Sequence, residues 1–143
     1  ADGLVLFNRF YQPDIDLETL TPKSDLHLSS PYEIRQSLLW IAMLAGRVDA
    51  SLAATSGVER SDEVVKYLLA GADVVMSASA LLRHGRGHIA VLRDGLEAWI
   101  DGRGFGSVVA MRGRLSARRL ETTETLLRAQ YAEMLISYSA EAG

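Results

Sequence analysis

The stretch VDASLAATSGVERSDEVVKYLLAGADVVMSASALL, residues 48–82, decides the fold. It begins with Val48–Ala54, a mostly apolar run of strand length, which the small residues Thr55-Ser56-Gly57 end. A second such run, Asp73–Met76, is followed by Ser77-Ala78-Ser79, which again contains no bulky side chain. The pattern therefore predicts two strands, each ending in a turn of small residues.

A helix is predicted between the two strands. Ser61-Asp62-Glu63 has the cap preference and the early acidic residues of a helix start, and Gly71 stands where the helix would end. The apolar stripe of this helix consists of Val64, Val65, Leu68 and Leu69. Because a crossover helix joins the two strands, we expect them to lie parallel in one sheet, with both turns at the same edge.

The small residues of the two turns favour binding of an anion by the backbone. Gly57 and the small Ser56 leave backbone N–H groups free to point at a ligand, and the amides of a short helix around Ala80 would face the same point. Two consecutive strands that end in such turns, the second leading into a short extra helix, match the phosphate site formed by the last two loops of a (β/α)8 barrel. The alternative is that both turns are ordinary tight connections.

Upstream, Leu4–Phe7 is predicted as another strand. It ends at Asn8-Arg9, and the carboxyl ends of strands carry the chemistry of parallel barrels. Asn8 is therefore a candidate ligand contact, and Arg9 is a candidate partner of an anion. In the alternative interpretation, Asn8 is a turn residue bonded to its own backbone and Arg9 is a solvated charge at the rim.

Residues 10–29 do not resemble an ordinary connection between a strand and a helix. Asp14–Leu17 and Leu26–Leu28 alternate polar and apolar residues on either side of a turn region, which predicts an inserted β-hairpin. Since the insertion follows the carboxyl end of a strand, the hairpin would lie over the mouth of the site as a lid or an interface.

The next helix has a strong start at Ser30-Pro31-Tyr32-Glu33, with serine at the N-cap, proline at the first position and glutamate completing a capping box. The helix is predicted to run to about Ala45 and to stop at Gly46. Its apolar surface is wide enough to indicate burial on two sides, and Trp40 is assigned to the core.

Three further helices are predicted, at His88–Asp101, Ser107–Met111 and Glu121–Tyr138. The first of them has an apolar face made of Ile89, Leu92, Leu96, Trp99 and Ile100. We therefore divide the chain into strand–helix units over residues 1–106 and a C-terminal helical extension over residues 107–143 that packs on them.

Composition excludes several classes of function. The chain has 143 residues, a net charge of −3, 48% hydrophobic residues and no cysteine. Without a basic cluster interleaved with aromatic residues, nucleic acid is not expected as a partner. The absence of cysteine excludes disulfides and thiolate metal ligands, and no metal site is predicted. No apolar run reaches the ~20 residues of a membrane span and no signal peptide is visible, so a cytoplasmic protein is expected. A homo-oligomer is compatible with the sequence.

Length limits how much of a barrel the chain can form. A complete (β/α)8 barrel takes ~250 residues, so 143 residues hold about three strand–helix units and a tail. The chain also opens directly on a strand, without an initiator methionine. We therefore expect an α/β fold, the C-terminal part of a (β/α)8 TIM barrel with presumed strands 6–8, an inserted hairpin and a helical tail, belonging to a longer protein.

Three segments carry a resemblance to a known family: VERSDEV (58–64), GADVVMSASALLRHG (71–85) and SVVAMRGRLS (107–116). They are similar to the last two strand–helix units and the tail of the dihydroorotate dehydrogenase family, the FMN-dependent barrels of pyrimidine synthesis. The divergent bacterial branch described as dihydroorotate dehydrogenase-like is the most similar. The resemblance covers nearly the whole chain.

This resemblance implies roles for particular residues. The backbone amides that bind the FMN phosphate in the family fall on Ser56-Gly57 and on Ala78-Ser79, and the asparagine that binds the pyrimidine substrate falls on Asn8. Two positions depart from the family pattern. Ser56 replaces a glycine, which is tolerable if the φ angle there is negative. Arg9 replaces a small hydroxyl residue, which leaves the identity of the substrate open.

The resemblance further implies that the whole protein oxidises dihydroorotate to orotate with FMN as cofactor and a small pyrimidine as substrate. The catalytic base and the lysine near the flavin belong to earlier strands, so no catalytic residue is assigned here, and this piece alone is expected to be inactive. Two alternatives remain: a flavin-free barrel enzyme that binds a phosphorylated substrate at the same turns, and a partial barrel that is a non-catalytic interaction module.

Overall fold

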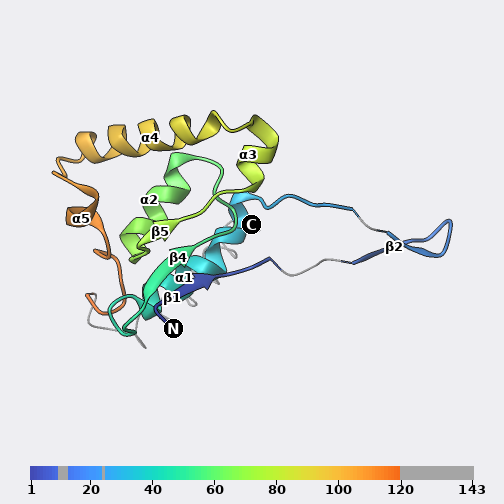
Figure 1. Cartoon of the computed structure of the whole chain (residues 1–143), viewed down its shortest axis with the longest axis horizontal. Helices are drawn as coiled ribbons and strands as arrows, with labels where there is room; N and C mark the ends of the chain where they lie inside the picture. The colour runs from blue at the N-terminus through green and yellow to red at the C-terminus, as the bar shows by residue number, and fades with distance from the viewer. Residues whose placement is uncertain (10–12, 24, 120–143) are drawn as a thin grey trace, which may run out of the picture.

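Three parallel strands form the sheet around which the chain is built (Figure 1). The computed structural model describes residues 1–9, 13–23 and 25–119. The strands are β1 (Gly3–Leu6), β4 (Ser51–Ala54) and β5 (Val74–Val75), and β4 lies between the other two. Both pairings are parallel, and the parallel pairing of β4 with β5 confirms the expectation from the crossover helix. β4 and β5 are shorter than the apolar runs that predicted them.

Two helices cover one face of this sheet. A 3-10 turn, η1 (Pro31–Glu33), leads into α1 (Ile34–Leu44), and α2 (Ser61–Ala70) connects β4 to β5. The predicted capping box is present, because the Glu33 carboxylate accepts a hydrogen bond from the Ser30 N–H at 3.0 Å. α2 ends at Gly71, whose φ of +118° is the left-handed conformation expected of a glycine after a helix.

The main core lies between the sheet and these two helices. Its members include residues of the strands, of α1, of α2 and of the segment between β4 and α2: Leu6, Ile34, Ile41, Leu52, Val58 and Tyr67. The other face of the sheet is apolar and open. Val5, Ala53 and Val74 lie in register there, and the two valines are more than half exposed. Within the described residues helices cover one face of this parallel sheet only, which is compatible with part of a barrel wall.

Three more helices follow β5 in the part of the chain that the structure describes. They are α3 (Ser79–His84), α4 (His88–Gly102) and α5 (Val108–Met111). α4 packs on α2, on the side away from the sheet (Figure 1). A second core is buried there, formed by Val65, Leu68, Ile100 and Met111. α5 begins as predicted, because the Ser107 hydroxyl accepts a hydrogen bond from the Ala110 N–H at 3.2 Å.

Two predicted core residues are exposed. Trp40 on α1 is 44% exposed, so its assignment to the core is wrong. The part of α1 that meets the sheet and α2 is narrower than the apolar surface of the helix, and Trp40 lies outside it. Ile89 is also exposed, because the buried contacts of α4 begin only at Leu92.

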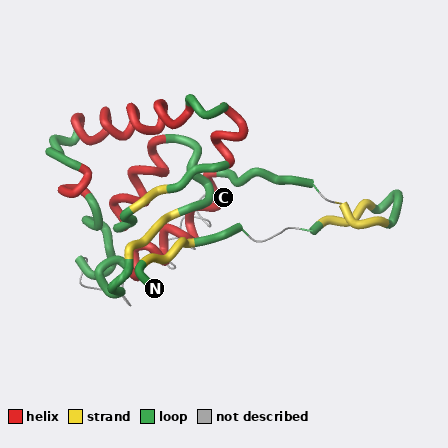
Figure 2. The backbone as a smooth tube through the Cα atoms, in the orientation of Figure 1, coloured by secondary structure: helices red, strands yellow, loops and turns green. Residues whose placement is uncertain are grey.

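The inserted hairpin is present, but its second strand differs from the prediction. β2 (Asp14–Asp16) pairs antiparallel with β3 (Thr21–Lys23), whereas Leu26–Leu28 forms no strand. The Asp16 carboxylate accepts hydrogen bonds from the N–H groups two and three residues later, at 2.8 and 3.1 Å, so the chain reverses immediately after Asp16. The hairpin forms an arm that projects away from the sheet and helices (Figure 2).

The predicted helix Glu121–Tyr138 lies outside the described residues, so the packing of the extension over residues 107–143 stays a prediction. Among the residues that the structure describes, no helix is both long enough and apolar enough to cross a bilayer.

Candidate functional site

A cavity of about 160 Å³ lies at the carboxyl ends of the three strands. Residues from the segments that follow β1, β4 and β5 line it, together with Ser29 from the segment before α1. The lining contains every residue that the sequence assigned to the site: Asn8, Ser56, Gly57, Ala78 and Ser79. The structure therefore brings these residues together from separate segments, while their binding roles remain predictions.

Gly57 differs from the prediction in one respect: its backbone N–H is not free. It donates a hydrogen bond to the Ser29 hydroxyl oxygen at 3.2 Å. The reason why position 57 requires a residue without a side chain also differs from the expected one, which was access of a ligand to the backbone. A Cβ atom at Gly57 would lie 2.6 Å from Ile34 Cγ2 and 2.7 Å from the Ser30 carbonyl oxygen, and φ is +73°. Gly57 is thus required by close packing against the start of η1 and α1.

Ser29 is the site residue that sequence reasoning missed. Its hydroxyl accepts the Gly57 bond and donates to the Ser79 hydroxyl oxygen at 2.8 Å, and its own N–H also donates to that oxygen at 3.0 Å. Ser29 is buried, so these bonds are shielded from water. It therefore ties the turn after β4 to the start of α3. The only signal in the sequence is its place in Ser29-Ser30-Pro31, where Ser30 alone was recognised as a cap.

Ser56 adopts a left-handed backbone conformation. Its φ angle is +78°, so the condition that this angle be negative for a serine to replace the family's glycine is not met. For a residue with a Cβ atom this conformation costs about 1–2 kcal/mol. The Ser56 hydroxyl donates to the Phe7 carbonyl oxygen at 3.3 Å, which ties the turn after β4 to the end of β1.

Tyr67, on α2, holds the turn after β4 in place through its hydroxyl group. Its ring is fully buried under β4, and its hydroxyl donates to the carbonyl oxygens of Ser56 at 3.0 Å and Thr55 at 3.2 Å. Burial, and to a lesser extent the charge of Glu63, raises the pKa of Tyr67 to about 12, so the hydroxyl keeps its proton and its role as a donor. The predicted stripe of α2 did not include this tyrosine.

The two polar side chains after β1 differ in their contacts. Arg9 forms an ion pair with Glu33, with its Nε 2.8 Å from one carboxylate oxygen, and Arg9 is the one charged residue among the described residues that line the cavity. The Asn8 side chain has no hydrogen-bond partner in the described part of the chain, so the interpretation in which it bonds its own backbone finds no support there.

Comparison with known proteins identifies the fold. No protein-family profile matches the sequence, and no curated protein matches it. Among solved structures, the chain is similar to the crystal structure of a ligand-free DHODH (dihydroorotate dehydrogenase) from Eimeria tenella, with a TM-score of 0.62 and 20% sequence identity. The fold is dihydroorotate dehydrogenase-like. The match covers 79% of this chain but only 32% of that one, and at this identity the similarity concerns the fold.

The cavity in this dihydroorotate dehydrogenase-like fold contains hydrogen-bond donors that remain available to a ligand. The N–H groups of Ser56 and Ala78 have no hydrogen-bond partner within the described residues. Because the Ser79 hydroxyl oxygen already accepts two bonds from Ser29, its own hydrogen is left to donate to a ligand. No carboxylate is among the described residues that line the cavity.

Size restricts what this cavity can hold. Its volume is below the range of about 300–1,000 Å³ of pockets that enclose a whole ligand. The residues present therefore fit the phosphate end of a nucleotide-like cofactor, while the ring system would have to lie outside the cavity. Within the described residues, no group of three or more histidine, aspartate or glutamate side chains could hold a metal ion.

Proposed function

We propose that this chain provides the FMN phosphate site of a dihydroorotate dehydrogenase-like oxidoreductase, which when complete oxidises dihydroorotate to orotate. The observation that carries the proposal is the meeting of two turns, Ser56-Gly57 after β4 and Ala78-Ser79 after β5, at one cavity without a carboxylate among its described residues. The likeness of the fold to a DHODH supports the same assignment.

Uncharged donors would form most of the hydrogen bonds to the phosphate. The Ser79 hydroxyl and the N–H groups of Ser56 and Ala78 can each donate to an anionic oxygen, and such charge-assisted bonds are about twice as strong as neutral ones. Arg9 adds positive charge at the edge of the cavity, although its ion pair with Glu33 offsets part of that charge. Most of the donors available to the dianion are therefore uncharged.

The chain's own contribution is positioning. The flavin supplies the hydride chemistry when it is bound, and the protein supplies orientation and charge. Ser29 links the two turns, and Tyr67 holds the first of them, so the donors keep a fixed spacing before a ligand arrives. A preorganised site of this kind loses little conformational entropy when the phosphate binds.

We expect FMN to bind at least about a hundredfold more tightly than riboflavin, which lacks the phosphate. Two charge-assisted hydrogen bonds of about 1.5 kcal/mol each account for such a ratio. Quenching of flavin fluorescence during titration with the purified protein measures both affinities. Equal affinities for the two flavins would show that the phosphate is not held here and would remove the basis of the proposal.

Asn8 is proposed to contact the pyrimidine substrate. The substitution Asn8→Ala is expected to weaken the affinity for a pyrimidine carboxylate about tenfold, the effect of one lost hydrogen bond to a charged ligand, and to leave the FMN content unchanged. Equilibrium dialysis with orotate, together with the flavin absorbance of the same samples, measures both quantities. Loss of flavin in the variant would instead assign Asn8 to the cofactor or to the fold.

A further inference from the structure

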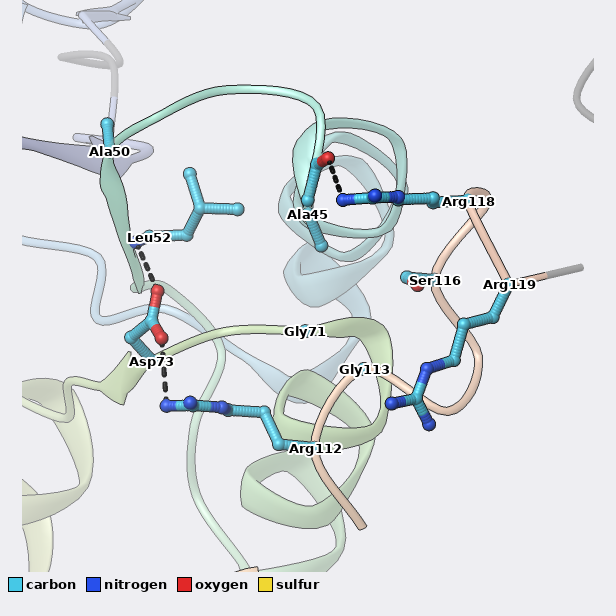
Figure 3. A pocket seen from close by; sticks show the side chains of 11 residues that line it. Ala45, Ala50, Leu52, Gly71, Asp73, Arg112, Gly113, Ser116, Arg118 and Arg119 are labelled. Atoms are coloured by element: carbon cyan, nitrogen blue, oxygen red, sulfur yellow. Dashed lines mark hydrogen bonds and ion pairs between the residues drawn. The ribbon is translucent and has the colours of Figure 1, made fainter. Parts of the chain in front are cut away.

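A second cavity, of about 440 Å³, lies at the opposite end of the strands (Figure 3). Its walls come from the segment after α1, from the residues just before β4 and β5, and from the segment after α5. In a parallel sheet these positions belong to the amino ends of the strands, whereas the cavity of the proposed function lies at their carboxyl ends. The two cavities are therefore separate.

Arginine side chains surround this second cavity. Arg112, Arg118 and Arg119 line it, and Asp73 is the only acidic residue among its described lining residues. The Asp73 carboxylate is already satisfied: it accepts a hydrogen bond from the Leu52 N–H at 2.8 Å and pairs with Arg112 at 2.8 Å. The lining consequently carries an excess of positive charge that no neighbouring carboxylate of the described chain neutralises.

Two of the arginines retain donors for a ligand. Arg118 donates through Nη1 to the Gly46 carbonyl oxygen at 2.7 Å, which fixes the side chain across the cavity wall (Figure 3). A Cβ atom at Gly46 would lie 3.0 Å from Arg118 Cδ, so the glycine makes room for this arrangement. The guanidinium group of Arg119 has no partner among the described residues, and all of its N–H donors remain available.

Ser116 supplies a neutral hydrogen-bond donor to this cavity. It is only 4% exposed and lines the cavity between the arginines, yet its hydroxyl has no hydrogen-bond partner within the described part of the chain. Among the described residues no buried side-chain polar atom lacks a hydrogen-bond partner, so the Ser116 hydroxyl oxygen is accessible from the cavity and its hydrogen can be donated to a bound oxygen anion. Gly71 and Gly113 also line the cavity; a Cβ atom at Gly113 would have no atom closer than 3.8 Å, whereas Gly71 is packed against Ala45.

We propose that this cavity binds the dianionic phosphate group of a small phosphate monoester. Guanidinium groups match phosphate oxygens in geometry and charge, and Ser116 adds a neutral donor. The volume exceeds that of the carboxyl-end cavity and falls within the range of about 300–1,000 Å³ typical of small-molecule sites, so it holds the organic part of the ester as well. The proposal does not depend on flavin binding.

The test is an NMR titration of the protein with ribose 5-phosphate, with ribose and with potassium chloride at matched ionic strength. The amide signals of Gly113 and Ser116 report on this cavity and not on the one at the other end. We expect these signals to shift in a saturable manner with the phosphate ester alone. Shifts of the same size with potassium chloride or with ribose would overturn the proposal.

Matched arginine substitutions complete the test. Arg118→Gln and Arg119→Gln are each expected to weaken the affinity about tenfold. The control is Arg114→Gln in the same segment, because the Arg114 guanidinium bonds the Ala110 carbonyl oxygen and lies over the Phe105 ring, outside the lining. The proposal is contradicted if Arg118→Gln and Arg119→Gln both leave the affinity for ribose 5-phosphate unchanged. It is also contradicted if Arg114→Gln lowers that affinity by the same factor.

A lipid headgroup offers the same phosphate chemistry. Co-sedimentation with vesicles that contain phosphatidic acid distinguishes a lipid headgroup from a soluble phosphate ester. If the cavity binds a metabolite, ribose 5-phosphate must bind without vesicles or displace the protein from them. Binding only to vesicles, without shifts from ribose 5-phosphate, would overturn the assignment to a small metabolite.

Discussion

Replacing Gly57 by alanine is expected to lower the free energy of unfolding by about 3 kcal/mol or more. A left-handed φ costs a residue with a Cβ atom about 1–2 kcal/mol, and overpacking a core typically costs about 1–3 kcal/mol. The Cβ atom would lie 2.7 Å from the Ser30 carbonyl oxygen, which is backbone and cannot move aside without shifting the start of α1. Urea unfolding of the variant measures the loss.

Gly104→Ala is the matched control for this substitution. Gly104 has nearly the same backbone angle, with φ at +70° against +73°, but no atom lies within 4 Å of the position of its Cβ. It should therefore show only the conformational cost of about 1–2 kcal/mol. If both variants lose the same free energy, close packing against Ser30 and Ile34 is not what requires glycine at position 57.

This expected loss of stability also limits the experiments that can probe the proposed phosphate site. A substitution of Gly57 would remove flavin binding through damage to the fold, whatever the role of the turn. Ser79 is the better position, because it lies at the first residue of α3, only part of its surface is buried, and its hydroxyl faces the cavity lining.

The substitution Ser79→Asp is expected to weaken FMN binding at least about a hundredfold. A carboxylate at this position would lie within hydrogen-bonding range of the bound phosphate, and two like charges at 4 Å repel each other by about 4 kcal/mol near a protein surface. Riboflavin affinity should stay unchanged, because riboflavin carries no phosphate. Titration of the variant with both flavins, followed by fluorescence, measures the difference.

Ser79→Asn is the control for size and for the lost hydroxyl. Asparagine has nearly the same shape as aspartate but carries no charge and can still donate a hydrogen bond. FMN affinity in this variant should fall far less than in the aspartate variant. An equal loss in both would mean that the hydrogen bonds between Ser29 and Ser79, and not repulsion of a phosphate, determine flavin affinity.

Local patterns in the sequence predicted most of the elements that position the site. The apolar runs around Leu52 and Val74, each followed by a turn of small residues, placed two parallel strands and the crossover helix between them. The cap at Ser30 with Glu33 and the stop at Gly71 were also correct. These features depend on residues that are close in sequence, so propensity and capping chemistry determine them.

Contacts between distant segments could not be predicted in this way. Ser29 meets Ser79 across 50 positions, and Gly57 packs against Ile34, so the reason for a glycine at 57 appears only when α1 is in place. One local feature was missed as well: the Asp16 carboxylate accepts hydrogen bonds from the N–H groups two and three residues later, which reverses the chain earlier than predicted. Trp40 was placed in the core by an apolar pattern that does not tell how many neighbours a helix has.

The central claim is that the turns after β4 and β5 hold the phosphate of FMN. Its most direct test is a comparison of backbone amide NMR shifts in the presence of FMN and of riboflavin, since the difference isolates the phosphate. We predict that the differences are largest at Ser56, Ala78 and Ser79. Differences confined to Gly113 and Ser116, at the arginine-lined cavity, would contradict the account and place the phosphate at the other end of the strands.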